Sequence, residues 1–245
     1  MAVLKERTGC AAALALALAV PIDGQAGPAP VVAVDVGHTL AAGGATSARG
    51  RMEFEFNRDL AREVAAALIR RGIAAHLVND DGKIASLRDR PKAVPDADLF
   101  ISIHHDSVSE HELSPWSWQG RALDYNDEFA GHSLFVSHDN PHLEASLTCA
   151  SVIGARLQRM GFVPTDKNAR RRAWADRANT VHWYDNLVVL YRTEVPAVLF
   201  EAGVIKNRAE ELQLREPAYQ QRMADGIATG IGACLQVMPL ARPAP

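Results

Sequence analysis

Short apolar segments alternate along the chain with longer segments whose apolar residues recur at helical spacing. Runs of a few mostly apolar residues are typical of strands buried on both faces of a sheet. They predict strands at residues 31–36, 73–78, 99–103, 133–137, 187–191 and 197–200. Helical spacing predicts helices at 53–71, 143–160, 208–215 and 217–236, and a shorter one beginning at 86–90. This alternation favours an α/β fold with a mainly parallel sheet covered by helices.

Two polar segments interrupt the alternation. Residues 37–50 hold four glycines and are predicted to form a loop. Residues 107–131 are polar, with scattered glycine and tryptophan, and are predicted to form a long surface excursion. Loops of that length in compact domains usually serve a function. Trp116 and Trp118 could line a glycan groove, although packing within the loop is the simpler interpretation.

The first residues have the order of a secretory signal peptide. Lys5 and Arg7 precede an uninterrupted apolar run at residues 10–20, and small residues and prolines follow. An eleven-residue run is too short to span a bilayer, which takes about 20 residues. We predict a signal peptide at residues 1–26 and one folded domain at 27–245. The protein is then secreted or periplasmic.

Composition narrows the class of protein. A chain of 245 residues that is 48% hydrophobic can bury a large core in a single domain. The formal net charge of −3 argues against a nucleic-acid partner, which would require a strongly basic surface. No apolar run approaches the length of a transmembrane helix. An enzyme or a binding domain remains, and we expect a monomer.

The cysteines leave one question open. Removal of the signal peptide leaves Cys149 and Cys234. They could pair in an oxidising compartment, but each lies among helix-forming residues, where a lone buried thiol is equally ordinary.

Polar side chains gather where the predicted strands end. In an open α/β sheet, ligands bind beyond the carboxyl ends of the strands. The residues expected there are His38, Glu53, His104, His105, Asp106 and Glu201. A catalytic zinc ion uses three nitrogen or oxygen ligands, and a separate carboxylate takes the proton of a water molecule. Two or three histidines with two glutamates can supply both parts.

These residues lie within motifs of a known family. The chain resembles the zinc-dependent N-acetylmuramoyl-L-alanine amidases of the amidase-3 type over residues 31–236. The resemblance rests on Val34–His38, Gly44-Ala45, Glu53 with Asn57, Ser102–His104, Pro196–Gly203 and Asn207. It implies that His38, Glu53 and His104 hold one zinc ion and that Glu201 is the catalytic glutamate. It also implies a twisted, mostly parallel sheet flanked by helices on both faces.

Two neighbouring residues compete for the ligand positions. Glu55 could replace Glu53, but the family's asparagine follows its ligand glutamate by four residues, and Asn57 fits only Glu53. His105 could replace His104, and strand alternation would point the two to opposite faces. The family's Ser-Ile-His motif favours His104, which leaves His105 and Asp106 as pocket residues.

Two other features receive simpler interpretations. Asp35 is expected to orient a ligand histidine. The run Arg170–Arg172 is expected to be a solvated helix face, although it could meet anionic wall polymers.

The resemblance implies a peptidoglycan hydrolase that cleaves the amide between N-acetylmuramic acid and L-alanine of the stem peptide. Two alternatives remain: a zinc peptidase or deacetylase acting on another cell-wall bond, and a non-catalytic wall-binding protein with this fold. The substrate partner is peptidoglycan in either enzymatic case, and a regulatory protein partner is possible. The excursion at residues 107–131 is the one segment that could cover the site.

Overall fold

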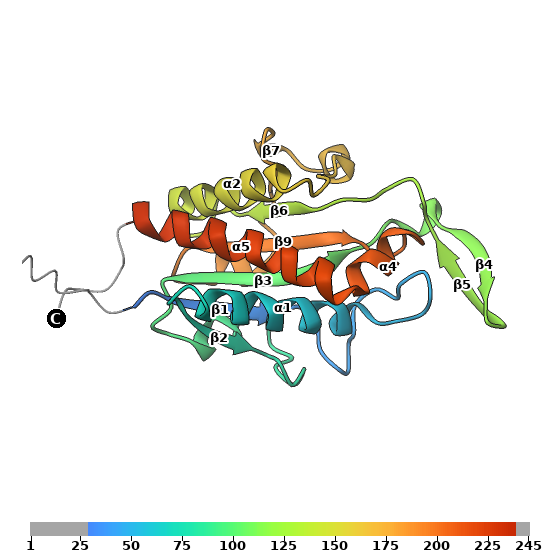
Figure 1. The fold of residues 1–245 in the computed structure, drawn as a ribbon, viewed down its shortest axis with the longest axis horizontal. Helices are drawn as coiled ribbons and strands as arrows, with labels where there is room; N and C mark the ends of the chain where they lie inside the picture. Colours follow the sequence, from blue (N-terminus) through green and yellow to red (C-terminus); the bar gives the residue numbers. More distant parts are fainter. Residues whose placement is uncertain (1–28, 239–245) are drawn as a thin grey trace, which may run out of the picture.

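The computed structural model describes residues 29–238, so the predicted signal peptide lies outside the described residues. Seven strands form one sheet in the order β2-β1-β3-β9-β6-β8-β7 (Figure 1). They are β1 (Val31–Val36), β2 (Ala74–Val78), β3 (Leu99–Asp106), β6 (Ser133–Val136), β7 (Trp174–Asp176), β8 (Val181–Trp183) and β9 (Ala197–Val204). The pairs β1–β2, β1–β3, β3–β9 and β6–β8 are parallel, whereas β6–β9 and β7–β8 are antiparallel. The predicted α/β class with a mostly parallel sheet is confirmed.

The two faces of the sheet are covered differently. Three long helices lie side by side over one face: α1 (Glu53–Ile69), α5 (Pro217–Val237) and α2 (Leu143–Arg159) (Figure 1). The short helix α4 (Glu210–Arg215) precedes α5. A smaller apolar cluster on the other face includes Val189 and Leu190 of the short helix α3 (Val188–Tyr191). Although α5 runs for 21 residues, no helix within residues 29–238 is both long and apolar enough to cross a membrane.

Strand alternation sorts side chains between these faces. In β1, Val34 and Val36 pack into the large core under the long helices, whereas Ala33 packs into the smaller cluster. In β3, Ile101 and Ile103 face the long helices in the same way. Polar residues that alternate with these apolar ones therefore lie on the opposite face.

Some predicted elements are wrong. Residues 187–191, predicted as a strand, form α3, because a short apolar run does not distinguish a buried strand from a buried helical turn. Residues 86–90 form turns, and a 3₁₀ helix follows at Pro91–Ala93. The Arg90 side chain is buried and its Nε donates to the carbonyl of Ile84 at 3.2 Å, which holds this segment in a turn.

The excursion at 107–131 is more ordered than expected. After a 3₁₀ turn at Glu110–Glu112, strands β4 (Ser114–Trp118) and β5 (Arg121–Tyr125) form an antiparallel hairpin that projects from the body of the domain (Figure 1). Trp116 and Trp118 stack on each other with ring centroids 5.5 Å apart. Trp116 Nε1 also donates to the carbonyl of Ala48, which ties the hairpin to the loop at 37–50. The tryptophans thus pack against their own surroundings, as the simpler interpretation held.

The open question about the cysteines is answered. Cys149 of α2 and Cys234 of α5 form a disulfide that closes a separation of 85 residues. Both residues are fully buried between the two helices and the sheet. The bond therefore fastens together two of the three helices that cover the large core.

Reduction of this disulfide is expected to lower the free energy of unfolding by about 2–4 kcal/mol, because the bond restricts the unfolded chain over a long loop. Denaturant unfolding of the oxidised and the reduced protein measures the difference without changing a side chain. Identical unfolding midpoints would show that the disulfide does not contribute to stability.

Candidate metal and catalytic site

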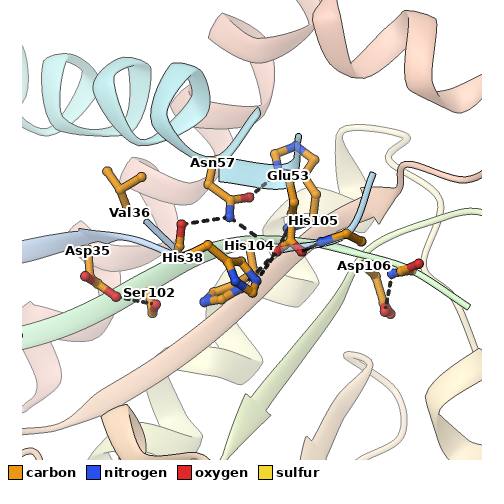
Figure 2. A network of polar contacts seen from close by, with 12 residues as sticks. Asp35, Val36, His38, Glu53, Asn57, Ser102, His104, His105 and Asp106 are labelled. Atoms are coloured by element: carbon orange, nitrogen blue, oxygen red, sulfur yellow. Dashed lines mark hydrogen bonds and ion pairs between the residues drawn. The ribbon is translucent and has the colours of Figure 1, made fainter. Parts of the chain in front are cut away.

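The structure brings together the three predicted metal ligands. His38 follows β1, Glu53 is the first residue of α1, and His104 lies in β3. One ligand atom from each lies within 4.8 Å of the other two, and the three side chains converge in Figure 2. The loop at 37–50 runs from β1 to α1 and so delivers two of the three ligands to the end of the sheet.

The geometry suits a small tetrahedral ion. Glu53 Oε1 lies 3.0 Å from His38 Nε2 and 3.1 Å from His104 Nδ1. Metal–ligand bonds of about 2.1 Å in a tetrahedron separate ligand atoms by about 3.4 Å. Two imidazole nitrogens and one carboxylate oxygen, with no thiolate, form a donor set that zinc accepts. The residues present therefore fit a catalytic zinc ion.

The backbone of His38 is held in an uncommon conformation. Its φ is 67°, a region that residues other than glycine rarely occupy. Asn79 Nδ2 donates to the His38 carbonyl at 2.7 Å, and a guanidinium nitrogen of Arg90 donates to the same oxygen. Arg90 also donates to the carbonyl of Val36 at 3.0 Å. These bonds stabilise the turn that aims His38 at the site.

Sequence reasoning missed Arg90 and Asn79. Arg90 is almost fully buried, although it lies in a turn where the sequence predicts the beginning of a short helix. No periodicity marks a residue whose partners are backbone carbonyls of a distant loop.

Two glycines make room for the ligands. A Cβ on Gly37 would lie 2.4 Å from the His104 ring. A Cβ on Gly44, whose φ is +77°, would lie 2.5 Å from Glu53 Oε2. Both distances are far below contact distance, so any side chain at these positions would displace a ligand.

Glu53 is the centre of the polar network. Its Oε2 accepts a hydrogen bond from the backbone N–H of Ala45 at 3.1 Å, and its Oε1 accepts one from Asn57 Nδ2 at 3.3 Å. Burial by itself would raise the pKa of the Glu53 carboxyl. Hydrogen bonds from His104 and His38 outweigh burial and hold that pKa well below its usual range. The carboxylate stays ionised, as a metal ligand must.

The competing residues lie elsewhere. Glu55 Oε2 accepts a hydrogen bond from the backbone N–H of Met52 at 3.3 Å, so it caps its own helix. His105 points to the face of the long helices, where it contacts Phe56 and its Nδ1 donates to Asn57 Oδ1 at 2.8 Å. Burial lowers the pKa of His105 to about 3, which keeps its ring neutral.

Asp35 does not have the role expected of it. Its Oδ2 accepts a hydrogen bond from Ser102 Oγ at 2.6 Å (Figure 2). The same oxygen lies 3.5 Å from Arg90 Nη1. No hydrogen bond joins Asp35 to a histidine within the described part of the chain. Asp35 therefore anchors Arg90 beneath the His38 turn and supports that ligand only indirectly.

Glu201 lies beside the cluster on the neighbouring strand. It pairs in register with His104 across β3 and β9, and residues in register on adjacent strands point to the same face. That face is opposite the long helices, because Phe200 and Ala202 belong to the large core. The sequence had placed Glu201 after a strand ending at residue 200, whereas β9 continues to Val204.

The Glu201 side chain is half-buried, and within residues 29–238 one of its two carboxyl oxygens is buried without a partner. Its Oε2 is inaccessible to solvent and has no hydrogen-bond partner among the described residues. Burial raises its pKa well above the usual value for glutamate, and the charges of Asp106 and Glu53 raise it further. Lys167 and Arg172 act in the opposite direction. A carboxyl with a raised pKa beside a metal site is suited to hold and release a proton.

A family model and several known proteins are similar to this chain. Residues 32–233 match the family model of N-acetylmuramoyl-L-alanine amidases. The probable cell wall amidase LytH of Staphylococcus aureus is 23% identical over 202 residues, which is 82% of this chain and 56% of that protein. The chain thus spans about half the length of the curated relatives it matches.

Solved structures share the fold. The catalytic domain of the amidase CwlV from Bacillus (Paenibacillus) polymyxa var. colistinus has a TM-score of 0.64 and 26% identity, covering 85% of this chain and 99% of that one. The amidase Ami1 from Mycobacterium smegmatis has a TM-score of 0.68 and 20% identity, covering 85% and 98%.

Substitutions can test the ligand set. His38→Ala, Glu53→Ala and His104→Ala are each expected to reduce bound zinc from roughly one ion per chain to a small fraction of that, because each removes one of three ligands. Glu55→Ala is the matched control that should retain zinc. His105→Ala removes the anchor of Asn57 but no ligand, so it should lose less zinc than His104→Ala. Elemental analysis of the purified variants, with circular dichroism to confirm folding, gives the measurement. Zinc lost in Glu55→Ala but kept in Glu53→Ala would show that the other glutamate is the ligand.

Proposed function

Because the chain belongs to the N-acetylmuramoyl-L-alanine amidase family, we propose that it is a zinc-dependent peptidoglycan hydrolase. The bond cleaved is the amide between the lactyl group of N-acetylmuramic acid and L-alanine of the stem peptide. The observation that carries the proposal is the cluster of His38, Glu53 and His104 next to the buried, unpartnered carboxyl oxygen of Glu201.

The three ligands would hold one zinc ion at the open end of the sheet. The chemistry supplied by such an ion is Lewis acidity, which polarises the scissile carbonyl and lowers the pKa of a water molecule. Asn57 and the N–H of Ala45 keep the Glu53 carboxylate in place through the hydrogen bonds described above. Asn79 and Arg90 do the same for the loop that carries His38.

Glu201 is proposed to carry the proton. Its carboxylate would accept a proton from the attacking water as the oxygen adds to the carbonyl carbon. The same group would then deliver that proton to the amide nitrogen as the carbon–nitrogen bond breaks. The amine leaves neutral, and Glu201 returns to its ionised form. Glu201 is not needed to complete a three-ligand site, which is the reason to assign it this role.

Two features support a location outside the cytoplasm. The disulfide between Cys149 and Cys234 belongs to an oxidising compartment. The relatives are cell wall amidases, whose substrate lies outside the cytoplasm. Secretion through the signal peptide expected at residues 1–26 is part of this proposal.

Glu201→Gln is the sharpest variant for testing this function. It keeps the shape of the side chain and removes the basic oxygen. Hydrolysis of purified sacculi should fall by about 10²–10⁴-fold, the usual contribution of a general acid–base group. Zinc content and sedimentation with peptidoglycan should remain at the parent level. A zinc-loaded Gln variant that hydrolyses sacculi at the parent rate would contradict the proposed mechanism.

Mass spectrometry of the parent digest identifies the bond. We expect free stem peptides beginning with L-alanine and glycan strands bearing intact lactyl groups. Shortened stems would instead indicate a peptidase, and acetate release a deacetylase. Binding to sacculi with no products at all would indicate a non-catalytic wall-binding protein.

A further inference from the structure

A small basic cavity lies next to the candidate site. Its volume is about 240 Å³, and it opens between the segment that follows β3 and the 3₁₀ helix at Lys167–Arg170. Its charged lining consists of Asp106, Glu112, Lys167, Arg170, Arg171 and Arg172. Four cations and two carboxylates leave the cavity with an excess of positive charge.

Two of the four cations are neutralised by the wall itself. Lys167 Nζ lies 2.9 Å from Asp106 Oδ1 and donates to the carbonyl of Ser107 at 2.7 Å. Arg170 Nη1 lies 2.6 Å from Glu112 Oε1. These pairs hold the cavity wall together and leave little charge for a ligand.

The other two cations form no ion pair within residues 29–238, although the charge of Arg172 lowers the pKa of the nearby Glu201. Arg171 is exposed and forms no side-chain ion pair there. The guanidinium carbon of Arg172 lies 3.5 Å from the ring centroid of Tyr184, so stacking fixes its position. Arg172 Nε is inaccessible to solvent and lacks a hydrogen-bond acceptor. Arg172 as a whole is only partly buried and lines the cavity, so its guanidinium charge acts on a ligand bound there.

The cavity is tied to the strand that carries Glu201. Asn168 Nδ2 donates to Asp106 Oδ2 at 2.9 Å and to Ser133 Oγ at 3.0 Å. Ser133 of β6 pairs in register with Glu201 of β9. One asparagine therefore bridges the cavity wall to the immediate neighbour of the proposed proton carrier.

We propose that Arg171 and Arg172 bind a free carboxylate of the stem peptide, in the part of the substrate that follows the scissile amide. This inference rests on the proposed function. A guanidinium presents paired donors that match a carboxylate, and stacking on Tyr184 reduces the entropy lost when Arg172 binds. The carboxylate belongs to the same molecule as the reacting amide. Once the amide is bound in the site, the carboxylate is therefore present near the cavity at a high effective concentration. The subsite makes the hydrolase selective for stem peptides in which the α-carboxylate of D-glutamate is free and not amidated.

Two soluble fragments that differ in one group test this selectivity. Both are disaccharide–stem peptides, one with the α-carboxylate of its D-glutamate free and the other with that group amidated. The parent enzyme should favour the acid over the amide by about tenfold in kcat/KM, the effect expected of a hydrogen bond to a charged group. In Arg171→Gln and Arg172→Gln this ratio should fall toward one. In Arg171→Gln the change should come mainly through KM, whereas Arg172→Gln should also lower kcat on both fragments, because the charge of Arg172 acts on Glu201.

Arg192→Gln is the matched control. Arg192 also stacks on a tyrosine, at 5.3 Å from the Tyr191 ring centroid, but it does not line the cavity. In Arg192→Gln, the ratio of kcat/KM for the acid fragment to kcat/KM for the amidated fragment should remain at the parent value. Melting temperatures of all variants show whether Arg172→Gln still folds, and the exposed Arg171 provides a test that does not disturb the packing on Tyr184. Equal losses on both fragments in both cavity variants would overturn the proposal.

Binding to metal-free protein separates this inference from the proposed function. Calorimetry with the released stem peptide should show tighter binding of the acid than of the amide, and the difference should disappear in Arg171→Gln. If neither fragment is cleaved but this difference persists, the proposed function fails while the carboxylate subsite stands. If glycerol phosphate polymer binds through the two arginines and the peptide acid does not, the carboxylate assignment is wrong.

Discussion

The site depends on the contacts made by one carboxylate, that of Glu53. One of its oxygens contacts both ligand histidines, and the other is held by the backbone of the loop that delivers His38. Burying an ionised carboxylate is unfavourable unless hydrogen bonds or charges compensate. Here the compensation comes from β1, α1, β3 and the loop at 37–50 together. The chain can therefore keep this carboxylate ionised only when these four segments are correctly assembled.

Successive side chains of β3 point to opposite faces of the sheet, and the residues on the two faces have different functions. His104 lies on the same face of the sheet as Glu201, so the proposed metal ligand and the proposed proton carrier are neighbours. His105 points to the other face and anchors Asn57, which in turn holds Glu53. Two consecutive histidines thus serve the same carboxylate from opposite sides. Slipping the strand by one residue would exchange them and destroy both contacts.

Much of this arrangement could be predicted from the sequence, and the exceptions have physical causes. Helix α1 could be predicted from the helical spacing of its apolar residues, and strands β1, β3 and β9 from their apolar runs. Each of these elements buries apolar side chains in the large core, and this burial produces the pattern. Residues 187–191 did not, because one helical turn and a short strand bury similar apolar runs. Arg90 could not be recognised, since its function depends on carbonyls brought near only by the fold. The sequence predicts a solvated helix face at Arg170–Arg172, whereas these residues line a cavity. The stacking of Arg172 on Tyr184 could not be predicted, because no feature of the neighbouring sequence indicates that contact.

The central claim is that His38, Glu53 and His104 form one metal site. Anomalous diffraction on crystals grown with zinc, recorded on both sides of the zinc absorption edge, tests it most directly. We expect a single strong peak in the anomalous difference map, about 2.0–2.2 Å from His38 Nε2, from a Glu53 carboxylate oxygen and from His104 Nδ1. A peak coordinated by Glu55 or His105, or no peak at the end of β1 and β3 in zinc-saturated crystals, would contradict it.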